Sequence, residues 1–379
     1  MLEFATLKVI WWLLLGTLLA GFAIMDGFDL GAGMLLPFIG RTDTERRVVI
    51  NTIGPVWEGN QVWLILGGGA IFAAWPALYA ASFSGFYLAM MLVLAALILR
   101  PVGFKFRSKM PNPGWRANWD RALFVGGTVP SLVFGVAMGN LLRGVPFSFD
   151  PELRATYSFG LLDLLNPFSL LCGIVSIAML LTHGAVYLAL KTDGVIAERA
   201  RRASRVTALA WILTFSLAGI WLWKSGYGFV IMQGGLPDGS PDPLHKAAIA
   251  LGGAWFANYD RWPATIAAPV LGLLAPALVA LLANSGRRLL AFAVSSLGVV
   301  AVIATVGVSL FPFLMPSSSH PSSSLTVWDA SSSQRTLQIM LIAVIIFLPL
   351  VLAYTSWVYR VMRGPVTSAY IDANRDTTY

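Results

Sequence analysis

The stretch LLAFAVSSLGVVAVIATVGVSLFP, residues 289–312, contains no charged side chain along its whole length. An α-helix needs about 20 mostly apolar residues to cross the hydrocarbon core of a bilayer. This stretch is therefore long enough and apolar enough to span a membrane as a helix. The rest of the chain has the same character, because further long apolar stretches lie on both sides of it.

The composition of the whole chain agrees with a membrane protein. Of its 379 residues, 57% are apolar and 12% are charged, and the mean hydropathy is +0.73. A soluble domain carries about 25% charged residues, so this chain has too few to cover a water-exposed surface. The aromatic content of 12% excludes an intrinsically disordered chain. The single cysteine, Cys172, excludes a disulfide framework and a multi-cysteine metal site.

Nine stretches have the length and apolar character of a transmembrane helix. The second and third are separated by little more than Trp75-Pro76, which predicts a tight hairpin. The expected fold class is all-α, a polytopic protein with one integral membrane domain over residues 1–379 and a polar tail at 360–379. Nine helices allow two four-helix bundles plus one peripheral helix. The predicted helices are 8–35, 50–75, 79–100, 122–142, 164–190, 205–224, 264–284, 289–312 and 336–358.

The basic residues predict the orientation of the chain in the membrane. If the loop after the first helix is cytoplasmic, 19 of the 26 basic residues lie on the cytoplasmic side. An excess of Lys and Arg marks the cytoplasmic loops, so we expect the N-terminus outside and the C-terminus inside. The net charge of +8 is then loop charge that orients a membrane protein, and we expect no nucleic-acid partner. An eight-helix count would put one basic loop on the wrong side.

Two segments on the predicted outer side are long. Residues 225–262 are rich in Gly, Pro and Asp, and we expect them to cap the outer face. Residues 316–335 are rich in serine, a composition typical of a flexible linker. Trp328 and Asp329, set among these serines, favour a folded surface loop instead, and the sequence leaves both interpretations open.

Three acidic residues lie inside predicted helices: Asp26, Asp29 and Glu58. A charged side chain near mid-membrane costs about 2.5–3.5 kcal/mol, so such residues face protein or water and are usually functional. Asp26 and Asp29 are three residues apart and share one face of the first helix. Glu58 lies in the polar run WEGNQVW, residues 57–63, of the second helix. We predict that the three acids form a polar inlet that opens to the cytoplasm.

The inlet has two interpretations. A carboxyl group held near lipid can exchange protons at neutral pH, which favours a proton or cation pathway. Alternatively, the acids cap broken helix ends or pair with Arg100 or Arg47 and only hold the helices together. The spacing does not distinguish a pathway from a structural cluster.

Histidine usage limits the cofactors that this chain could hold by itself. Of the three histidines, only His183 lies in a predicted helix. Haems buried in helical bundles need axial His or His/Met ligands, so one histidine cannot hold several haems. We interpret His183 as a hydrogen-bonded packing residue. The sequence also shows no zinc spacing, nucleotide-binding loop or nucleophile motif, so we expect no metal site and no catalytic residue in this chain.

Several blocks of the sequence resemble subunit II of the cytochrome bd-type quinol oxidases. They extend from the first predicted helix to the last, so the resemblance covers essentially the whole chain. The blocks are DGFDLG (26–31), WEGNQVW (57–63), FAAWP (72–76) through RPVG (100–103), GNLLRGVPF (139–147), LNPF (165–168), FPFLMPSS (311–318) and SLTVWDASSSQ (324–334).

The resemblance implies a complex in the bacterial inner membrane that oxidises ubiquinol or menaquinol and reduces O₂ to water. In this family subunit I carries two b-type haems, haem d and the quinol-oxidising site, which agrees with the scarcity of histidine. Subunit II pairs with subunit I as a pseudo-symmetric half, and a small single-helix subunit often joins them. The resemblance also allows a quinone bound as a structural component, besides the surrounding lipid. The expected tasks of subunit II are to stabilise subunit I and to supply part of the proton route.

The resemblance also assigns roles to individual residues. Asp29 and Glu58 match acids along the family's polar channel, with Asp26 as a further candidate. Trp63 is a candidate for oxygen entry or for packing. Familiar members often have Asp at the position of Glu58, and an acid where this chain has Lys105. If that acid collects protons, this chain needs another entry residue, for which Asp120 is a candidate.

Two other classes of protein share these features. A proton-coupled secondary transporter or permease subunit would also have discontinuous helices and acids near the membrane midplane. A purely structural partner subunit would keep the acids without using them for proton transfer. The long matching blocks favour the oxidase over the transporter.

Overall fold

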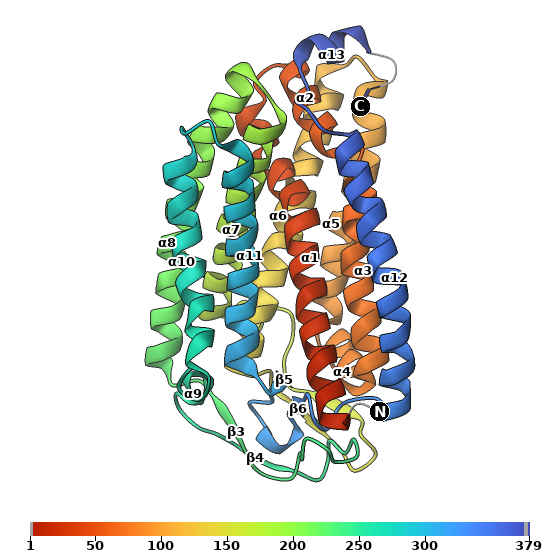
Figure 1. Cartoon of the computed structure of the whole chain (residues 1–379), viewed down its shortest axis with the longest axis vertical. Helices are drawn as coiled ribbons and strands as arrows, with labels where there is room; N and C mark the ends of the chain where they lie inside the picture. Colours follow the sequence, from red (N-terminus) through yellow and green to blue (C-terminus); the bar gives the residue numbers. More distant parts are fainter. Residues whose placement is uncertain (1–2, 375–377) are drawn as a thin grey trace.

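The computed structural model describes residues 3–374 and 378–379 and is dominated by long helices that run side by side (Figure 1). Shorter helices cover the two ends of this bundle. The helices are α1 (Phe4–Ile39), α2 (Asp43–Ile53), α3 (Trp57–Ala74), α4 (Pro76–Gly85), α5 (Tyr87–Phe106), α6 (Pro113–Arg143), α7 (Pro167–Lys191), α8 (Gly194–Ser225), α9 (Ala257–Arg261), α10 (Ala267–Leu282), α11 (Arg288–Leu310), α12 (Gln334–Val361) and α13 (Ser368–Ala373).

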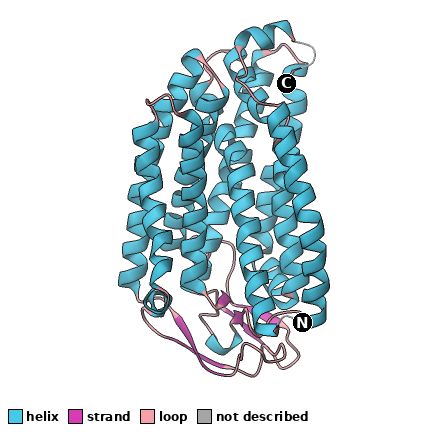
Figure 2. Cartoon of the chain, viewed as in Figure 1, coloured by secondary structure: helices cyan, strands magenta, loops and turns pink. Residues whose placement is uncertain are grey.

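The strands form three small antiparallel pairs that gather at one end of the bundle (Figure 2). They lie in connections between helices and add no separate sheet layer. The pairs are β1 (Phe147–Phe149) with β2 (Ala155–Tyr157), β3 (Phe229–Gln233) with β4 (Ala247–Ala250), and β5 (Phe313–Met315) with β6 (Leu325–Thr326).

Polar residues in the loops fix where several helices begin. Thr42 accepts a hydrogen bond from the backbone N–H of Glu45, and the Glu45 side chain accepts one from the Thr42 N–H, which makes a capping box for α2. Asn112, Asn166 and Ser333 each accept backbone N–H groups at the first turns of α6, α7 and α12. These side chains satisfy N–H groups that have no partner inside the helix.

Eight helices of the described residues are long and apolar enough to cross a membrane: α1, α6, α7, α8, α11, α12, and α5 and α10 with their adjoining turns. Helix α3 runs beside them, but Glu58, Asn60 and Gln61 make its first turns too polar for composition to mark it as a span. With α3 included, nine helices traverse the bundle. The two chain ends lie at opposite ends of the molecule, as an odd number of crossings requires (Figure 1). The predicted all-α polytopic fold is confirmed.

The helix boundaries differ from the predicted ones. Residues 50–53 belong to α2, and a turn at 54–56 separates them from α3, so the second predicted helix starts seven residues too early. The third predicted helix is interrupted at Phe86, between α4 and α5. Helices α6 and α8 begin about ten residues before the predicted starts because their charged first turns continue past the apolar stretch. Hydropathy finds the part of a helix that suits lipid, whereas hydrogen bonding and caps fix its ends.

The long helices pack as two groups of four. Helices α7, α8, α10 and α11 form one bundle, and α1, α3, α5 and α6 form the other; α7 joins them by packing against α1 and α6. Where α1 crosses α7, a Cβ atom on Gly184 would lie 2.6 Å from the Gly31 carbonyl carbon, so only glycines allow this approach. Helix α12 lies at the edge against α1 and α3, and Leu337 is the one residue of this helix that is buried. The predicted peripheral helix is therefore α12.

The serine-rich segment is folded, as Trp328 and Asp329 suggested. Ser324 Oγ accepts a hydrogen bond from the Ser317 N–H at 2.9 Å, and both residues are fully buried. Asp329 is also buried and lies 3.2 Å from Lys246 Nζ, which ties this segment to the long 225–262 segment. The linker interpretation is wrong because these serines use their hydroxyls to hold a packed loop.

The polar tail also contains ordered structure in its described part. Helix α13 packs against α2, and Ile371 is buried in that contact. Residues 375–377 of the predicted tail lie outside the described residues.

Candidate functional site

Two of the predicted acids meet an arginine inside the bundle. Arg100 Nη1 donates to Asp26 Oδ2 at 2.9 Å, and Arg100 Nη2 donates to Asp26 Oδ1 at 2.6 Å. The side chains are 0% exposed for Asp26 and 3% exposed for Arg100. The 19 basic residues assigned to the cytoplasmic side from the sequence include Arg100 as a loop charge, which is wrong: it lies in α5, buried against an acid on α1. Without Arg100, basic residues are still in excess at the end of the bundle that carries α2 and α13.

Asp29 lies one turn further along α1, 3.9 Å from Arg100 Nη2. Its Oδ2 atom accepts a hydrogen bond from Asn60 Nδ2 at 2.8 Å, and the Tyr359 hydroxyl donates to Asn60 Oδ1, also at 2.8 Å. Asp29 Oδ1 is buried and has no hydrogen-bond partner among the described residues. The chain Asp29–Asn60–Tyr359 joins α1, α3 and the peripheral α12.

Aromatic side chains enclose this cluster. The Arg100 guanidinium carbon lies 6.0 Å from the ring centroid of Trp57, the residue that begins α3. Phe28 and Tyr187 stack with ring centroids 3.8 Å apart, and the Tyr187 hydroxyl donates to the Thr52 carbonyl. The side chains of Asp26 and Arg100 are themselves buried, so solvent screens the ion pair little.

Glu58 lies apart from the buried acids. It stands in the first turn of α3, between buried Trp57 and buried Asn60, but its side chain is exposed. Within the described residues it makes no hydrogen bond or ion pair. The structure therefore brings Asp26 and Asp29 together and turns Glu58 to the outer face of the same bundle.

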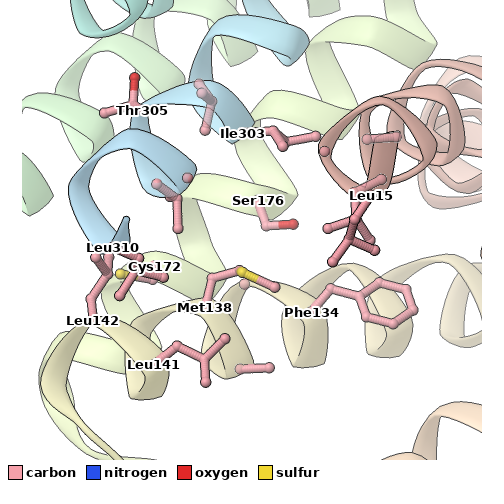
Figure 3. Close-up of a pocket in the computed structure, with 18 of the residues that line it drawn as sticks. Leu15, Phe134, Met138, Leu141, Leu142, Cys172, Ser176, Ile303, Thr305 and Leu310 are labelled. Carbon is pink, nitrogen blue, oxygen red and sulfur yellow. The ribbon is translucent and has the colours of Figure 1, made fainter. Parts of the chain in front are cut away.

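Trp63 is packed in the bundle, two turns below Trp57. The residue is 8% exposed, and a Cβ atom on Gly21 would lie 2.6 Å from its ring. Trp63 also lines an apolar cavity of about 2750 Å³ that extends between the two four-helix bundles. Figure 3 shows part of this cavity, where Phe134 and Met138 of α6 and Ser176 of α7 point into the space.

His183 is held on both sides of its ring. Nδ1 lies 2.9 Å from Ser295 Oγ, Nε2 lies 2.9 Å from the Ile24 carbonyl oxygen, and the ring stacks on Phe292. Both nitrogens are engaged in hydrogen bonds between helices, as the packing interpretation expects. Among the described residues, no group of three or more His, Cys, Asp or Glu side chains could hold a metal ion.

The residues considered for proton entry have different environments. Lys105 is exposed, and its Nζ lies 3.4 Å from the Tyr379 hydroxyl. Asp120 is buried and receives hydrogen bonds from Arg107, at 2.5 and 3.2 Å, and from Arg46 at 2.8 Å. Both oxygens of Asp120 are thus committed to arginines, which favours a structural role for this carboxylate.

Asn60 and Tyr359 are the site residues that sequence reasoning missed. Asn60 lies within the polar run 57–63, so its position in a transmembrane helix was an available signal. Tyr359 is 299 residues further along the chain, and nothing in the local sequence marks it as a partner of Asn60.

Comparisons with known proteins agree with this architecture. Residues 7–362 match the family model described as cytochrome bd terminal oxidase subunit II. The chain is 48% identical to cytochrome bd-I ubiquinol oxidase subunit 2 of Escherichia coli K12 and 49% identical to a probable cytochrome oxidase subunit 2 of Haemophilus influenzae, with both chains of each pair fully covered.

Two more distant proteins match over nearly the whole chain, one in sequence and one in fold. Cytochrome bd ubiquinol oxidase subunit 2 of Bacillus subtilis is 33% identical, with 96% of this chain and 98% of the relative covered. A chain in the solved structure of bd oxidase from Geobacillus thermodenitrificans superposes with a TM-score of 0.70 at 20% identity, covering 94% of this chain and 98% of that one. Because the family model spans nearly all the helices described above and full-length relatives are almost half identical, the chain belongs to the family of cytochrome bd terminal oxidase subunits II.

Proposed function

We propose that this chain is the subunit II of a quinol-oxidising, O₂-reducing complex of the bacterial inner membrane, where it packs against haem-bearing subunit I and supplies part of the cytoplasmic proton route. The observation that carries the proposal is the closeness of a buried acid cluster on α1 to an exposed acid, Glu58, on α3. Asn60, which donates to Asp29, is two residues from Glu58 on α3.

The exposed face of α3 and α12 supports the contact with subunit I. Glu58 begins an exposed stripe on α3 that continues through Val62 and Ile65. An acid on a lipid-facing surface costs about 2.5–3.5 kcal/mol at mid-membrane, so a protein partner is the more favourable neighbour. Helix α12, which lies beside α3, is almost wholly exposed and apolar, and it would complete the same interface.

The hydrogen-bonded chain supports a role in proton transfer. Asn60 holds Asp29 and Tyr359 in fixed positions, and Asp29 Oδ1 keeps a free acceptor site in the interior. Protons would travel through the carboxyl groups of Glu58 and Asp29 and through water, with Asn60 as a positioning residue. Asp26 fits this route less well because both of its oxygens are bound to Arg100.

The cofactors of the complex would lie mainly in subunit I. His183, which uses both ring nitrogens in hydrogen bonds, would have to give one up to bind a haem iron, so this chain's residues fit the b and d haems poorly. Ubiquinol or menaquinol is the proposed electron donor. The large apolar cavity beside Trp63 would suit the isoprenoid tail of a structural quinone, and the same apolar path is a candidate for O₂ entry. A small single-helix subunit would complete the complex.

The test is a comparison of acid-to-amide variants in the assembled oxidase. Glu58→Gln and Asp29→Asn are expected to lower quinol-dependent O₂ consumption at least tenfold while the haem spectrum keeps its normal amplitude. Glu198→Gln, which makes the same change at an exposed acid on α8, is the matched control and should keep full turnover. Normal turnover in both variants would rule out the proton route.

A loss of haem from the variants would instead make the acids structural. The oxidase assignment itself is tested by a reduced-minus-oxidised spectrum of the complex purified in mild detergent. A red chlorin band beside b-haem bands, with a larger chain co-purifying, is expected. A colourless protein that purifies alone would favour the proton-coupled transporter.

A further inference from the structure

A small niche at the cytoplasmic end of the bundle combines two cations with an apolar wall. It has a volume of about 290 Å³ and is lined by residues from the end of α1, from α2 and from α6. Arg46 and Arg121 provide the cations, and Phe38 and Phe124 pack edge to face, 6.1 Å apart, to form the apolar side. Asp120 also lines the niche, with its carboxylate bound to Arg46 and Arg107. Phe38 is 66% exposed although it is a large apolar side chain near the end of a transmembrane helix.

The niche follows the order of groups in a phospholipid. Arg121 and Phe124 are three residues apart on α6 and so share one face of the helix. Phe124 is the deeper of the two because α6 begins at the α2 end of the bundle and runs inward (Figure 1). Arg121 therefore lies nearer the end of the bundle than Phe124, which is the order of a headgroup and its acyl chains in a phospholipid.

The surrounding ion pairs leave an excess of positive charge. Asp120 binds Arg46 and Arg107, while Asp43 binds Arg107 and Arg116. Three arginines thus share two carboxylates. The Arg107 Nη1 atom is buried and has no hydrogen-bond partner among the described residues, so the acids do not use all the donors.

Arg121 adds a further cation to this network. Its side chain is exposed, and within the described residues its one hydrogen bond goes to the neutral Asn118 side chain at 3.2 Å. Arg46 is 27% exposed, and its bonds to other described residues use Nε, which donates to the Gly40 carbonyl, and Nη1, which donates to Asp120. Both arginines can therefore offer donors to an anion without breaking an existing pair.

We propose that this niche binds the phosphate headgroup of an anionic phospholipid from the cytoplasmic leaflet, with Phe38 and Phe124 against its acyl chains. A guanidinium binds a phosphate through two parallel N–H donors, which makes arginine well suited to this ligand. The volume corresponds to about ten water molecules, enough for a phosphodiester group. None of the lining residues belongs to α3 or α12, so the proposed contact with subunit I leaves the niche open to lipid.

The test measures lipid binding to the assembled, delipidated oxidase by native mass spectrometry. Dioctanoyl-phosphatidylglycerol is the probe, and dioctanoyl-phosphatidylcholine has the same chains without net charge. Arg121→Gln is expected to weaken phosphatidylglycerol binding about fivefold, the effect of one basic residue near an anionic surface. Arg46→Gln should weaken it as well, and Arg287→Gln, an exposed cytoplasmic arginine outside the niche, should leave binding unchanged.

Three results would overturn the proposal. Equal losses in Arg121→Gln and Arg287→Gln would show that any surface cation attracts the lipid. Equal binding of phosphatidylcholine would show that the phosphate's net charge is not recognised. Inorganic phosphate that binds as tightly as phosphatidylglycerol would make the niche a site for free anions rather than for lipid.

Discussion

Replacing Arg100 should destabilise the protein more than replacing its partner Asp26. Arg100 makes two hydrogen bonds to Asp26, and Asp29 is the next nearest acid at 3.9 Å. In Arg100→Gln, two buried carboxylates lose their common cation. In Asp26→Asn, Arg100 keeps Asp29 as a counter-ion within reach. The asymmetry follows from the two-to-one ratio of acids to arginine in this cluster.

The expected magnitudes follow from general measurements on buried pairs. Removing one partner of a buried ion pair costs about 3–5 kcal/mol, which we expect for Arg100→Gln. Asp26→Asn loses the charge assistance of its hydrogen bonds, worth about 1.5–3 kcal/mol, and part of this returns through Asp29. The double variant should be less destabilised than Arg100→Gln alone because one of the two unpaired carboxylates is gone.

The assay is unfolding of the purified oxidase in detergent, followed by intrinsic tryptophan fluorescence during SDS titration. The exposed Arg287→Gln variant controls for the loss of a charge on the protein. An Asp26→Asn variant as unstable as Arg100→Gln would refute the reasoning. So would simple additivity in the double variant, since residues in direct contact are expected to show an interaction energy.

Three further predictions concern the outer loops and the helix crossing. Burial raises the pKa of Asp329, and the charge of Lys246 opposes this shift. Lys246→Met should therefore raise the pKa of Asp329 further. The variant should lose more thermal stability relative to wild type at pH 8, where the carboxylate is charged, than at pH 5. Gly31→Val should destabilise the α1–α7 crossing by at least about 1–3 kcal/mol in the same SDS titration, whereas Gly16→Val, with open space around its Cβ position, should cost far less. Lys8 Nζ donates to three loop carbonyls at 2.7–3.0 Å. Lys8→Met should therefore speed proteolysis of residues 234–246. An unchanged cleavage rate would show that the loop is held by other contacts.

The membrane-spanning architecture was predictable because it depends on the length of apolar stretches. The positions of helix ends were less so, because they depend on individual caps such as Thr42 and on turns such as the one at 54–56. Arg100 shows a further limit. Hydropathy places a charged residue at the membrane surface, but an acid on a neighbouring helix can hold it inside, and that acid is 74 residues away in the sequence.

The candidate site was likewise predictable only in part. The spacing of Asp26 and Asp29 on one helix predicted that they share a face, and the structure places both against Arg100. The link from Asn60 to Tyr359 could not be predicted, because α12 reaches α3 only after the chain has crossed the bundle several more times. Local periodicity gives the face of a helix but not the identity of the helix that meets it.

The position of Glu58 bears on how a proton route through this chain could work. Residues two apart on a helix point about 200° apart, so Asn60 faces the buried cluster while Glu58 faces outward. Glu58 and Asp29 therefore cannot line one inlet within this chain alone. A route that uses both acids has to pass along the boundary with a neighbouring protein, where α3 turns from its exposed side to its buried side. Such a route would therefore require assembly with subunit I.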